Sequence, residues 1–323
     1  MRAVILAVAF ALVAVGCASG ATVPSSASGG NTGVPQTAEP TTTTTEVVLP
    51  EPPRYVPLDG EPAADQKQLA ADTAQALTTY ETGTAAADVG RQLEALLVDP
   101  QIADAAAGLR ADDSASVGEI VYPQLGGLTD TQASVMVVVR QRLLRDGEER
   151  SVTRTVDVRL ARTNQTWNVT GVASIGGSPP DPPAALSPTA SEVLANTAIE
   201  LPDSARWDIQ RGGTDDRVLS LLLAMAAEQT LSVTVLASGH PPNVFDSASI
   251  SNHTRGRGVD IWAVDGQPVL SQRDPAGPLH ALTTELLALG VTELGSPWDL
   301  DGPGGAAFTN TLHQDHLHLA FDS

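Results

Sequence analysis

Positive charge and cysteine are both scarce in this chain of 323 residues. Asp and Glu number 38 against 18 Lys and Arg, which gives a net charge of -20, and Lys67 is the sole lysine. Nucleic-acid binding requires a basic face, and an anionic membrane surface attracts basic segments. The composition therefore argues against nucleic acid as a partner and against electrostatic attachment to lipid headgroups.

The only cysteine, Cys17, comes at the end of a short apolar run. A single cysteine excludes a disulfide within the chain. The run begins after Arg2 and ends at Gly16, which is too short to cross a bilayer and is typical of an export signal. A small residue followed by a lone Cys resembles a bacterial lipoprotein signal. That resemblance predicts a signal peptide at residues 1–17, lipidation of Cys17, and anchoring on the extracytoplasmic face of the cell membrane; a plain signal peptide is the alternative.

Composition divides the rest of the chain into four segments. Residues 18–57 are rich in Ser, Thr, Gly and Pro and are predicted to form a disordered tether, because they hold too little apolar surface to fold. Residues 58–176 form a first domain, and residues 177–190 form a Pro-rich linker. Residues 191–323 form a second domain. Both domains mix helical and strand patterns, so we expect an α+β fold for each.

The first domain begins with apolar residues at helical spacing in 63–83 and 86–110, followed by strand patterns from 118 to 177. Asp146 and Gly147 form a hairpin turn between two of these strands. Helices followed by an antiparallel sheet resemble the cystatin-like or NTF2-like fold in architecture only. We expect this domain to be a spacer or to bind an unknown partner in the cell envelope; a ligand pocket is the alternative.

The second domain combines helical patterns at 215–230 and 275–290 with strands at 231–239, 258–266 and 316–322. This order predicts a small domain with one antiparallel sheet and packed helices.

All six histidines lie in the second domain. His253 and Asp260 are seven positions apart, and the two glycines between them allow the chain to bend. His316 and His318 are two apart on a predicted strand, so their side chains point to the same face. One Asp and two His supply N and O ligands for zinc and leave a fourth position open, as in catalytic sites. His280 and His313 are expected to be ordinary surface or core residues.

Three motifs resemble one known family. The stretch SNHTRGRGVD (251–260) and the closing DHLH (315–318) resemble the metal-binding motifs of the zinc D-alanyl-D-alanine carboxypeptidases and endopeptidases, the VanX/VanY-like group of peptidase family M15. The upstream ASGHPP is similar to the S-G-x-R-P strand end of that family. The resemblance covers residues 231–323. It implies one zinc ion per chain, and hydrolysis of peptide bonds in peptidoglycan stem peptides.

Carried onto this sequence, the resemblance implies that His253, Asp260 and His318 are the zinc ligands. It implies that Asp315 is the general base for zinc-activated water, and that His316 stabilises or orients the tetrahedral intermediate.

The Arg of the family's upstream motif is missing, because His240 and Pro241 follow Ser238 and Gly239. This departure leaves recognition of a substrate carboxylate without its usual residue. It keeps open a non-catalytic alternative, a zinc-holding lipoprotein that binds envelope peptides. The candidate substrate-binding residues are Ser251, His240, Arg255 and Arg257.

Overall fold

The computed structural model describes residues 49–322, which lie in one compact unit. The expected signal peptide, Cys17 and the tether as far as residue 48 lie outside the described residues. Within residues 49–322, no helix is long and apolar enough to cross a membrane.

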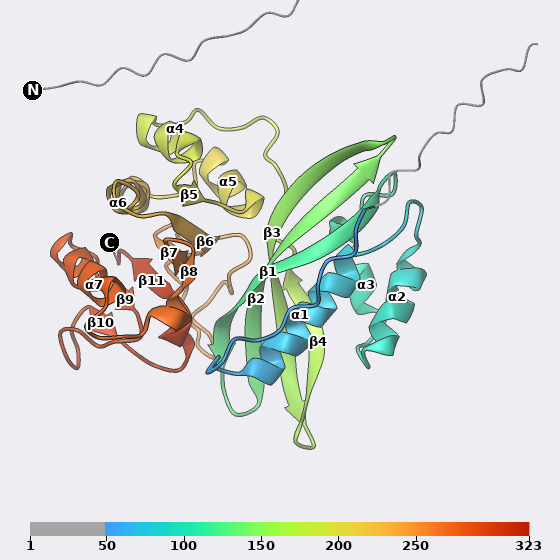
Figure 1. The fold of residues 1–323 in the computed structure, drawn as a ribbon, viewed down its shortest axis with the longest axis horizontal. Coiled ribbons are helices and arrows are strands. Elements are labelled where there is room, and N and C mark those ends of the chain that lie inside the picture. Colours follow the sequence, from blue (N-terminus) through green and yellow to red (C-terminus); the bar gives the residue numbers. More distant parts are fainter. Residues whose placement is uncertain (1–48, 323) are drawn as a thin grey trace, which may run out of the picture. The chain divides into compact units, whose positions relative to one another are not determined.

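The first part of the chain, whose helices and strands lie in residues 64–174, packs three helices against a four-stranded sheet (Figure 1). The strands follow one another in the order β1-β2-β3-β4, and every neighbouring pair is antiparallel. Asp146 and Gly147 both have positive φ in the β2–β3 turn, as a tight hairpin needs. The elements are α1 (Ala64–Thr78), α2 (Ala86–Ala95), α3 (Ile102–Ala105), a 3-10 turn (Ala107–Leu109), β1 (Ala115–Leu128), β2 (Gln132–Arg145), β3 (Glu148–Thr163) and β4 (Thr166–Ser174).

The core of this part lies between α1 and one face of the sheet. Ala70, Ala74 and Leu77 of α1 pack in one cluster with Val135 and Val137 of β2. Met136 and Val138, which alternate with these valines along β2, are buried as well. Because successive strand residues point to opposite faces, both faces of β2 are covered.

The second part of the chain, whose helices and strands lie in residues 188–320, forms a seven-stranded sheet with helices around it. Its path is β10-β9-β11-β7-β6-β5, and β8 pairs with β7. The elements are α4 (Pro188–Ala195), β5 (Ile199–Glu200), α5 (Asp203–Gln210), α6 (Asp216–Ala226), β6 (Leu231–Val235), β7 (Gly258–Val264), β8 (Gln267–Pro268), a 3-10 turn (Val269–Gln272), α7 (Pro278–Ala288), β9 (Glu293–Gly295), β10 (Ala307–Phe308), a 3-10 turn (Leu312–Gln314) and β11 (Leu317–Ala320).

The mixed α+β class predicted from the sequence is confirmed. The central pairs of the second sheet are antiparallel, as expected, whereas the outer pairs β10–β9 and β5–β6 are parallel. The Pro-rich segment from residue 175 to 187 has neither helix nor strand, and α4 begins at Pro188, inside the expected linker.

Short contacts join the two parts within the compact unit. Tyr122 of β1 stacks on Trp262 of β7, with ring centroids 4.8 Å apart. Thr155 of β3 donates its hydroxyl to Thr234 O of β6 at 2.5 Å. Gly239 has a φ of +110°, and a Cβ there would lie 2.5 Å from Thr155 O. The first sheet therefore packs directly against the sheet that carries the histidines.

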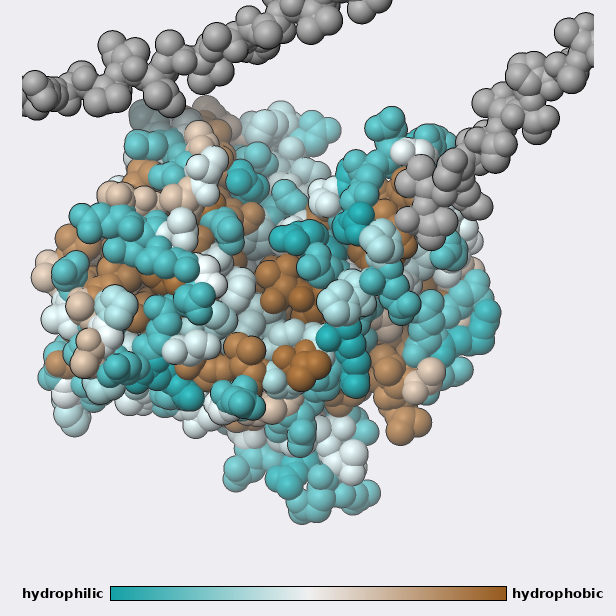
Figure 2. Space-filling model, viewed as in Figure 1, coloured by the Kyte–Doolittle hydropathy of each residue, from teal (hydrophilic) through white to brown (hydrophobic). Residues whose placement is uncertain are grey.

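The face seen in Figure 2 is mainly hydrophilic, and its apolar residues gather in several small patches. This agrees with the acidic composition of the chain.

Candidate metal centre

Three side chains predicted as metal ligands meet at one point of the second sheet. Asp260 of β7 and His318 of β11 are direct register partners, and His253 comes from the loop before β7. His253 Nε2 lies 3.1 Å from Asp260 Oδ1 and 3.1 Å from His318 Nδ1, and His318 Nδ1 lies 2.9 Å from Asp260 Oδ1. Two ligand atoms on one tetrahedral zinc ion, with bonds near 2.0 Å, lie about 3.3 Å apart. The triangle therefore has the size of a metal site.

A neighbour holds the other polar atom of each candidate ligand. Leu236 O lies 2.5 Å from His253 Nδ1, and Glu293 Oε2 lies 3.4 Å from His318 Nε2. Gln124 of β1 donates its amide to Asp260 Oδ2 at 2.7 Å. Metal-binding histidines and carboxylates are commonly oriented by such outer hydrogen bonds. These contacts leave Nε2, Nδ1 and Oδ1 to face one another.

Strong electrostatic coupling accompanies this packing. Burial would raise the pKa of Asp260, but the His253 and His316 imidazoles outweigh it and lower that pKa well below its usual range. Burial disfavours a proton on His318, but hydrogen bonds to Asp260 and Glu293 raise the pKa of His318 to about 9. The His318 hydrogen bond also lowers the pKa of Glu293 to about 2.

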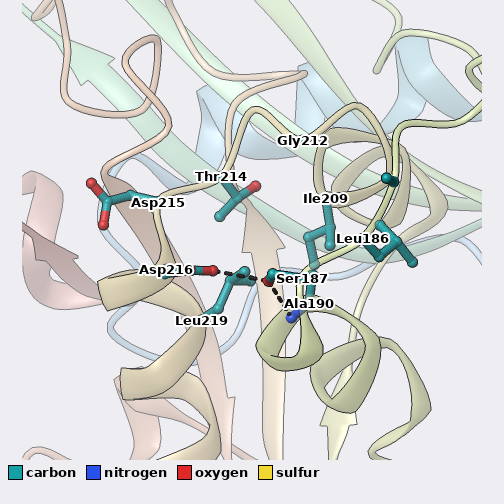
Figure 3. Close-up of a pocket in the computed structure, with 10 residues that line it drawn as sticks. Leu186, Ser187, Ala190, Ile209, Gly212, Thr214, Asp215, Asp216 and Leu219 are labelled. Carbon is teal, nitrogen blue, oxygen red and sulfur yellow. Dashed lines mark hydrogen bonds between the residues drawn. The ribbon is translucent and has the colours of Figure 1, made fainter.

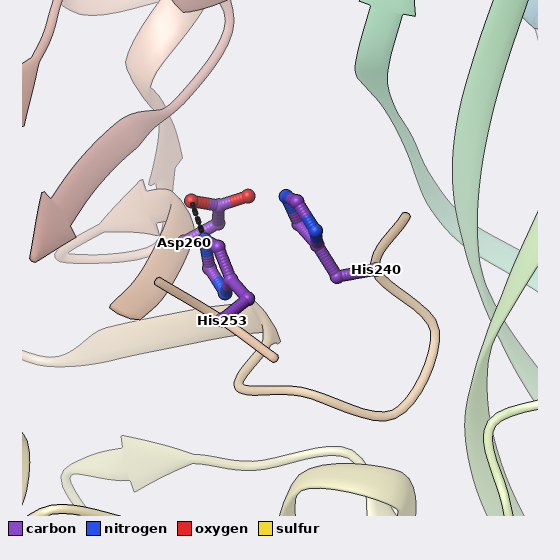
Figure 4. Close-up of side chains that lie close together, drawn as sticks. All are labelled: His240, His253 and Asp260. Atoms are coloured by element: carbon purple, nitrogen blue, oxygen red, sulfur yellow. Dashed lines mark hydrogen bonds and ion pairs between the residues drawn. The ribbon is translucent and has the colours of Figure 1, made fainter. Parts of the chain in front are cut away.

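His240 provides a fourth possible ligand. Its ring stacks on His253 with centroids 3.9 Å apart, and its Nδ1 lies 2.7 Å from Pro241 O. His240, His253 and Asp260 each offer a ligand atom within 4.8 Å of the others, so this cluster could hold a metal ion (Figure 4). Burial lowers the pKa of His240 well below its usual value, which favours the neutral imidazole that metals bind. The set that contains His318 is the more compact of the two.

Asp315 and His316 form a buried pair beside the candidate ligands. Asp315 Oδ1 lies 2.6 Å from His316 Nδ1, and Asp315 Oδ2 lies 2.5 Å from the Lys67 ammonium. Burial would raise the pKa of Asp315, but the charge of Lys67 outweighs it and lowers that pKa. An ionised carboxylate only accepts hydrogen bonds, so His316 Nδ1 is the donor. His316 Nε2 then faces Asp260 Oδ2 at 3.9 Å.

A cavity of about 650 Å³ opens onto this cluster. Its walls come from both parts of the chain, and they include Asp260, His316 and His318 but not Asp315. Asp315 is fully buried. The structure therefore gives His316, instead of Asp315, access to a bound molecule. Other lining residues are Leu125, Gly126, Met136, His240, Phe245, Ser251, Arg255, Glu293, Phe308 and His313.

The expected substrate-binding residues differ in position. Ser251 is buried, and its hydroxyl accepts a hydrogen bond from His253 N at 3.2 Å, so it orients the ligand loop. Arg255 lines the cavity, with Nη1 donating to Ile250 O at 2.9 Å. Arg257 does not line the cavity, and its Nη1 donates to Asp322 O at 2.7 Å.

His313 lies at the site, contrary to the expectation that it is an ordinary surface or core residue. His313 lies in the 3-10 turn before β11. Its ring centroid is 5.0 Å from that of His316 and 5.7 Å from that of His318. Burial lowers the pKa of His313 well below its usual value. Its spacing of three residues from His316 was the available signal. His280 packs edge-on against Trp298 and has no contact with this cluster among the ring contacts of the described residues.

A second cavity, of about 410 Å³, lies between the starts of α4 and α6 (Figure 3). Ser187 Oγ bonds to Asp216 at 3.0 Å and accepts from Ala190 N at 3.1 Å. The hydrogen bonds of Ser187 are therefore made within the protein, and no histidine lines this cavity. It is a weaker candidate for a catalytic or metal site.

No protein-family model, curated protein or solved structure matches this chain.

Proposed function

We propose that this protein is a zinc-dependent peptidase that hydrolyses peptide bonds of peptidoglycan stem peptides outside the cytoplasmic membrane, to which Cys17 would anchor it. The observation that carries the proposal is the triangle of His253 Nε2, Asp260 Oδ1 and His318 Nδ1, with sides of 2.9 to 3.1 Å. The substrate class comes from the resemblance of the sequence motifs to the zinc carboxypeptidases and endopeptidases.

The donor set suits zinc. Two imidazole nitrogens and one carboxylate oxygen are common zinc ligands, and three protein ligands leave a position for substrate or water. The cavity that adjoins the triangle supplies the space for that position. A bound zinc ion supplies Lewis-acid chemistry, because it polarises a carbonyl and makes water acidic enough to attack near neutral pH.

His316 is the group best able to move a proton. Its Nδ1 donates to Asp315, which leaves the lone pair of Nε2 toward Asp260 and the cavity. We assign proton acceptance from the attacking water to His316 Nε2. Asp315 orients the ring and stabilises the imidazolium that forms, as a buried carboxylate does for a catalytic histidine. This division of roles differs from the one implied by the motif resemblance, in which Asp315 is the base.

The size and the lining residues of the cavity suit a peptide substrate. Its volume of about 650 Å³ lies in the usual range for ligand pockets, roughly 300–1,000 Å³. Phe245, Phe308 and Met136 offer apolar surface, and Arg255 offers a cation to a substrate carboxylate. Arg255 is therefore the candidate replacement for the missing Arg of the upstream motif.

The test uses residues 46–323 loaded with zinc and incubated with purified muropeptides, followed by mass spectrometry of the products. The wild type should release a stem-peptide product, and His316→Gln should keep its zinc but lose turnover by about 100-fold or more. His280→Gln is the matched histidine control and should cleave normally. Zinc-loaded wild type that binds muropeptides without cleaving any would instead support the non-catalytic binding protein.

A further inference from the structure

Lys67 is a fully buried cation whose partners come from both parts of the chain. Its ammonium lies 2.5 Å from Glu61 Oε1, 2.5 Å from Asp315 Oδ2 and 3.4 Å from Tyr122 OH. An ammonium has three N–H donors, and these three partners can take all of them. A buried charge is costly unless it is paired, so this geometry is strongly constrained.

Strand β1 contacts the same site beside Lys67. Leu125 N donates to Asp315 Oδ2 at 3.2 Å, and the neighbouring Gln124 donates to Asp260 Oδ2 at 2.7 Å. The first part of the chain therefore contacts both buried carboxylates of the candidate site. Gln124 is itself fully buried, and its Oε1 has no hydrogen-bond partner among the described residues.

We propose that Lys67 is a positioning residue of the metal centre, which holds Asp315 and, through Asp315, fixes the His316 ring with Nε2 toward the cavity. This inference rests on the proposed function for the role of His316 in hydrolysis. Asp315 has one oxygen for His316 and one for Lys67 and Leu125, so the carboxylate plane is set by contacts on both sides. The helix and sheet of residues 64–174 are then an obligatory part of the site.

A variant of Glu61 can separate the positioning of Asp315 by Lys67 from the charge pairing of Lys67 with Glu61. Its carboxylate also accepts hydrogen bonds from Tyr55 OH at 2.9 Å, Tyr122 OH at 2.8 Å and Leu58 N at 2.8 Å, and it does not line the cavity. Glu61→Gln therefore changes the Lys67 cluster while leaving the contact between Lys67 and Asp315. The double variant Lys67→Met/Glu61→Gln removes the cation and the carboxylate that would otherwise be left unpaired.

The experiment compares these two variants with wild type, all as residues 46–323. Folding is checked by thermal unfolding, and zinc content by elemental analysis. The His316 tautomer is read from long-range ¹H–¹⁵N spectra of histidine-labelled protein, with the His316 signal assigned from His316→Gln. The kcat and KM for muropeptide cleavage are then measured.

Wild type and Glu61→Gln should show His316 as one tautomer, protonated at Nδ1. The double variant should bind zinc normally but show mixed tautomers, with kcat lowered about 10- to 100-fold and KM nearly unchanged. A folded, zinc-loaded double variant with the wild-type tautomer and kcat would overturn the proposal. If the double variant does not fold, Lys67→Gln, which keeps N–H donors but removes the charge, provides the same comparison.

The tautomer measurement does not depend on turnover. If wild-type protein cleaves no muropeptide but the tautomer changes in the double variant, the positioning role stands and the proposed hydrolysis fails. If cleavage is seen and the tautomer and kcat do not respond, the hydrolysis stands and the positioning role fails.

Discussion

His318 on β11 lies directly opposite Asp260 on β7, and His318 Nδ1 is 2.9 Å from Asp260 Oδ1. Two adjacent antiparallel strands thus bring together residues far apart in the chain, and the loop before β7 adds His253 to the pair. Because strand pairing fixes the separation of both backbones, two of the three proposed ligands are held by the sheet itself. The sheet therefore places these two side chains next to each other without a bound ligand.

Zinc affinity should rise with pH. In the metal-free protein, His318 has a pKa of about 9 because hydrogen bonds to Asp260 and Glu293 outweigh the effect of burial. Zinc must displace that proton, so affinity should increase by about tenfold per pH unit up to about pH 9 and then level off. Chelator-competition titrations at several pH values would measure this. A pH-independent affinity over that range would contradict it.

The stability of the metal-free protein should have the opposite pH dependence. The folded pKa of His318 lies above the ordinary histidine value of about 6.5, so its protonation stabilises the fold fully below that pH. This stabilisation is lost as the pH rises toward about 9. Chemical denaturation of metal-free wild type should show the loss, and His318→Ala should show much less of it. Equal slopes in both proteins would rule out His318 as the cause.

Gln124 should control zinc affinity from outside the ligand set. Gln124→Met removes the amide that holds Asp260 Oδ2, so zinc binding should weaken by about 10- to 100-fold. Gln141→Met is the matched control, because Gln141 is also buried but donates to Leu109 O and does not line the cavity. That control should lose stability without losing zinc affinity. Equal zinc affinity in the two variants would contradict the role of Gln124.

Gly239 should be needed for contact between the two sheets. A Cβ at this position would lie 2.5 Å from Thr155 O, and the backbone has a positive φ that non-glycine residues rarely adopt. Gly239→Ala should therefore destabilise the fold by more than about 1 kcal/mol. Gly147→Ala also changes a glycine with positive φ, but has no atom within 4 Å of the added Cβ. Denaturant unfolding should show a larger loss for Gly239→Ala, and equal losses would argue against a tight contact there.

Local patterns in the sequence account for the mixed fold, whereas the grouping of His253, Asp260 and His318 was predicted from the resemblance of the motifs to those of the zinc peptidases. The turn at Asp146 and Gly147 and the helices α1, α6 and α7 follow from turn residues and apolar periodicity, which act over a few residues. His316 and His318 both reach the site, although β11 begins one residue after His316.

Contacts between distant segments could not be predicted in this way. Gln124 and Asp260 are 136 positions apart, and Leu125 and Asp315 are 190 apart. No periodicity relates such pairs, because their contact depends on how two sheets pack. The uniqueness of Lys67 was visible in the sequence, but its partner Asp315 was not. The parallel edge pairs and the position of His313 depend on the same long-range packing.

We propose that His253, Asp260 and His318 together hold one zinc ion. The most direct measurement is the zinc content of residues 46–323 after dialysis, for wild type, His318→Ala and the control His280→Ala. We expect about one zinc per chain in wild type and in the control, and about a tenth of that or less in His318→Ala. If wild type takes up no zinc when it is supplied, or if His318→Ala retains the full amount, these three residues do not form the zinc site.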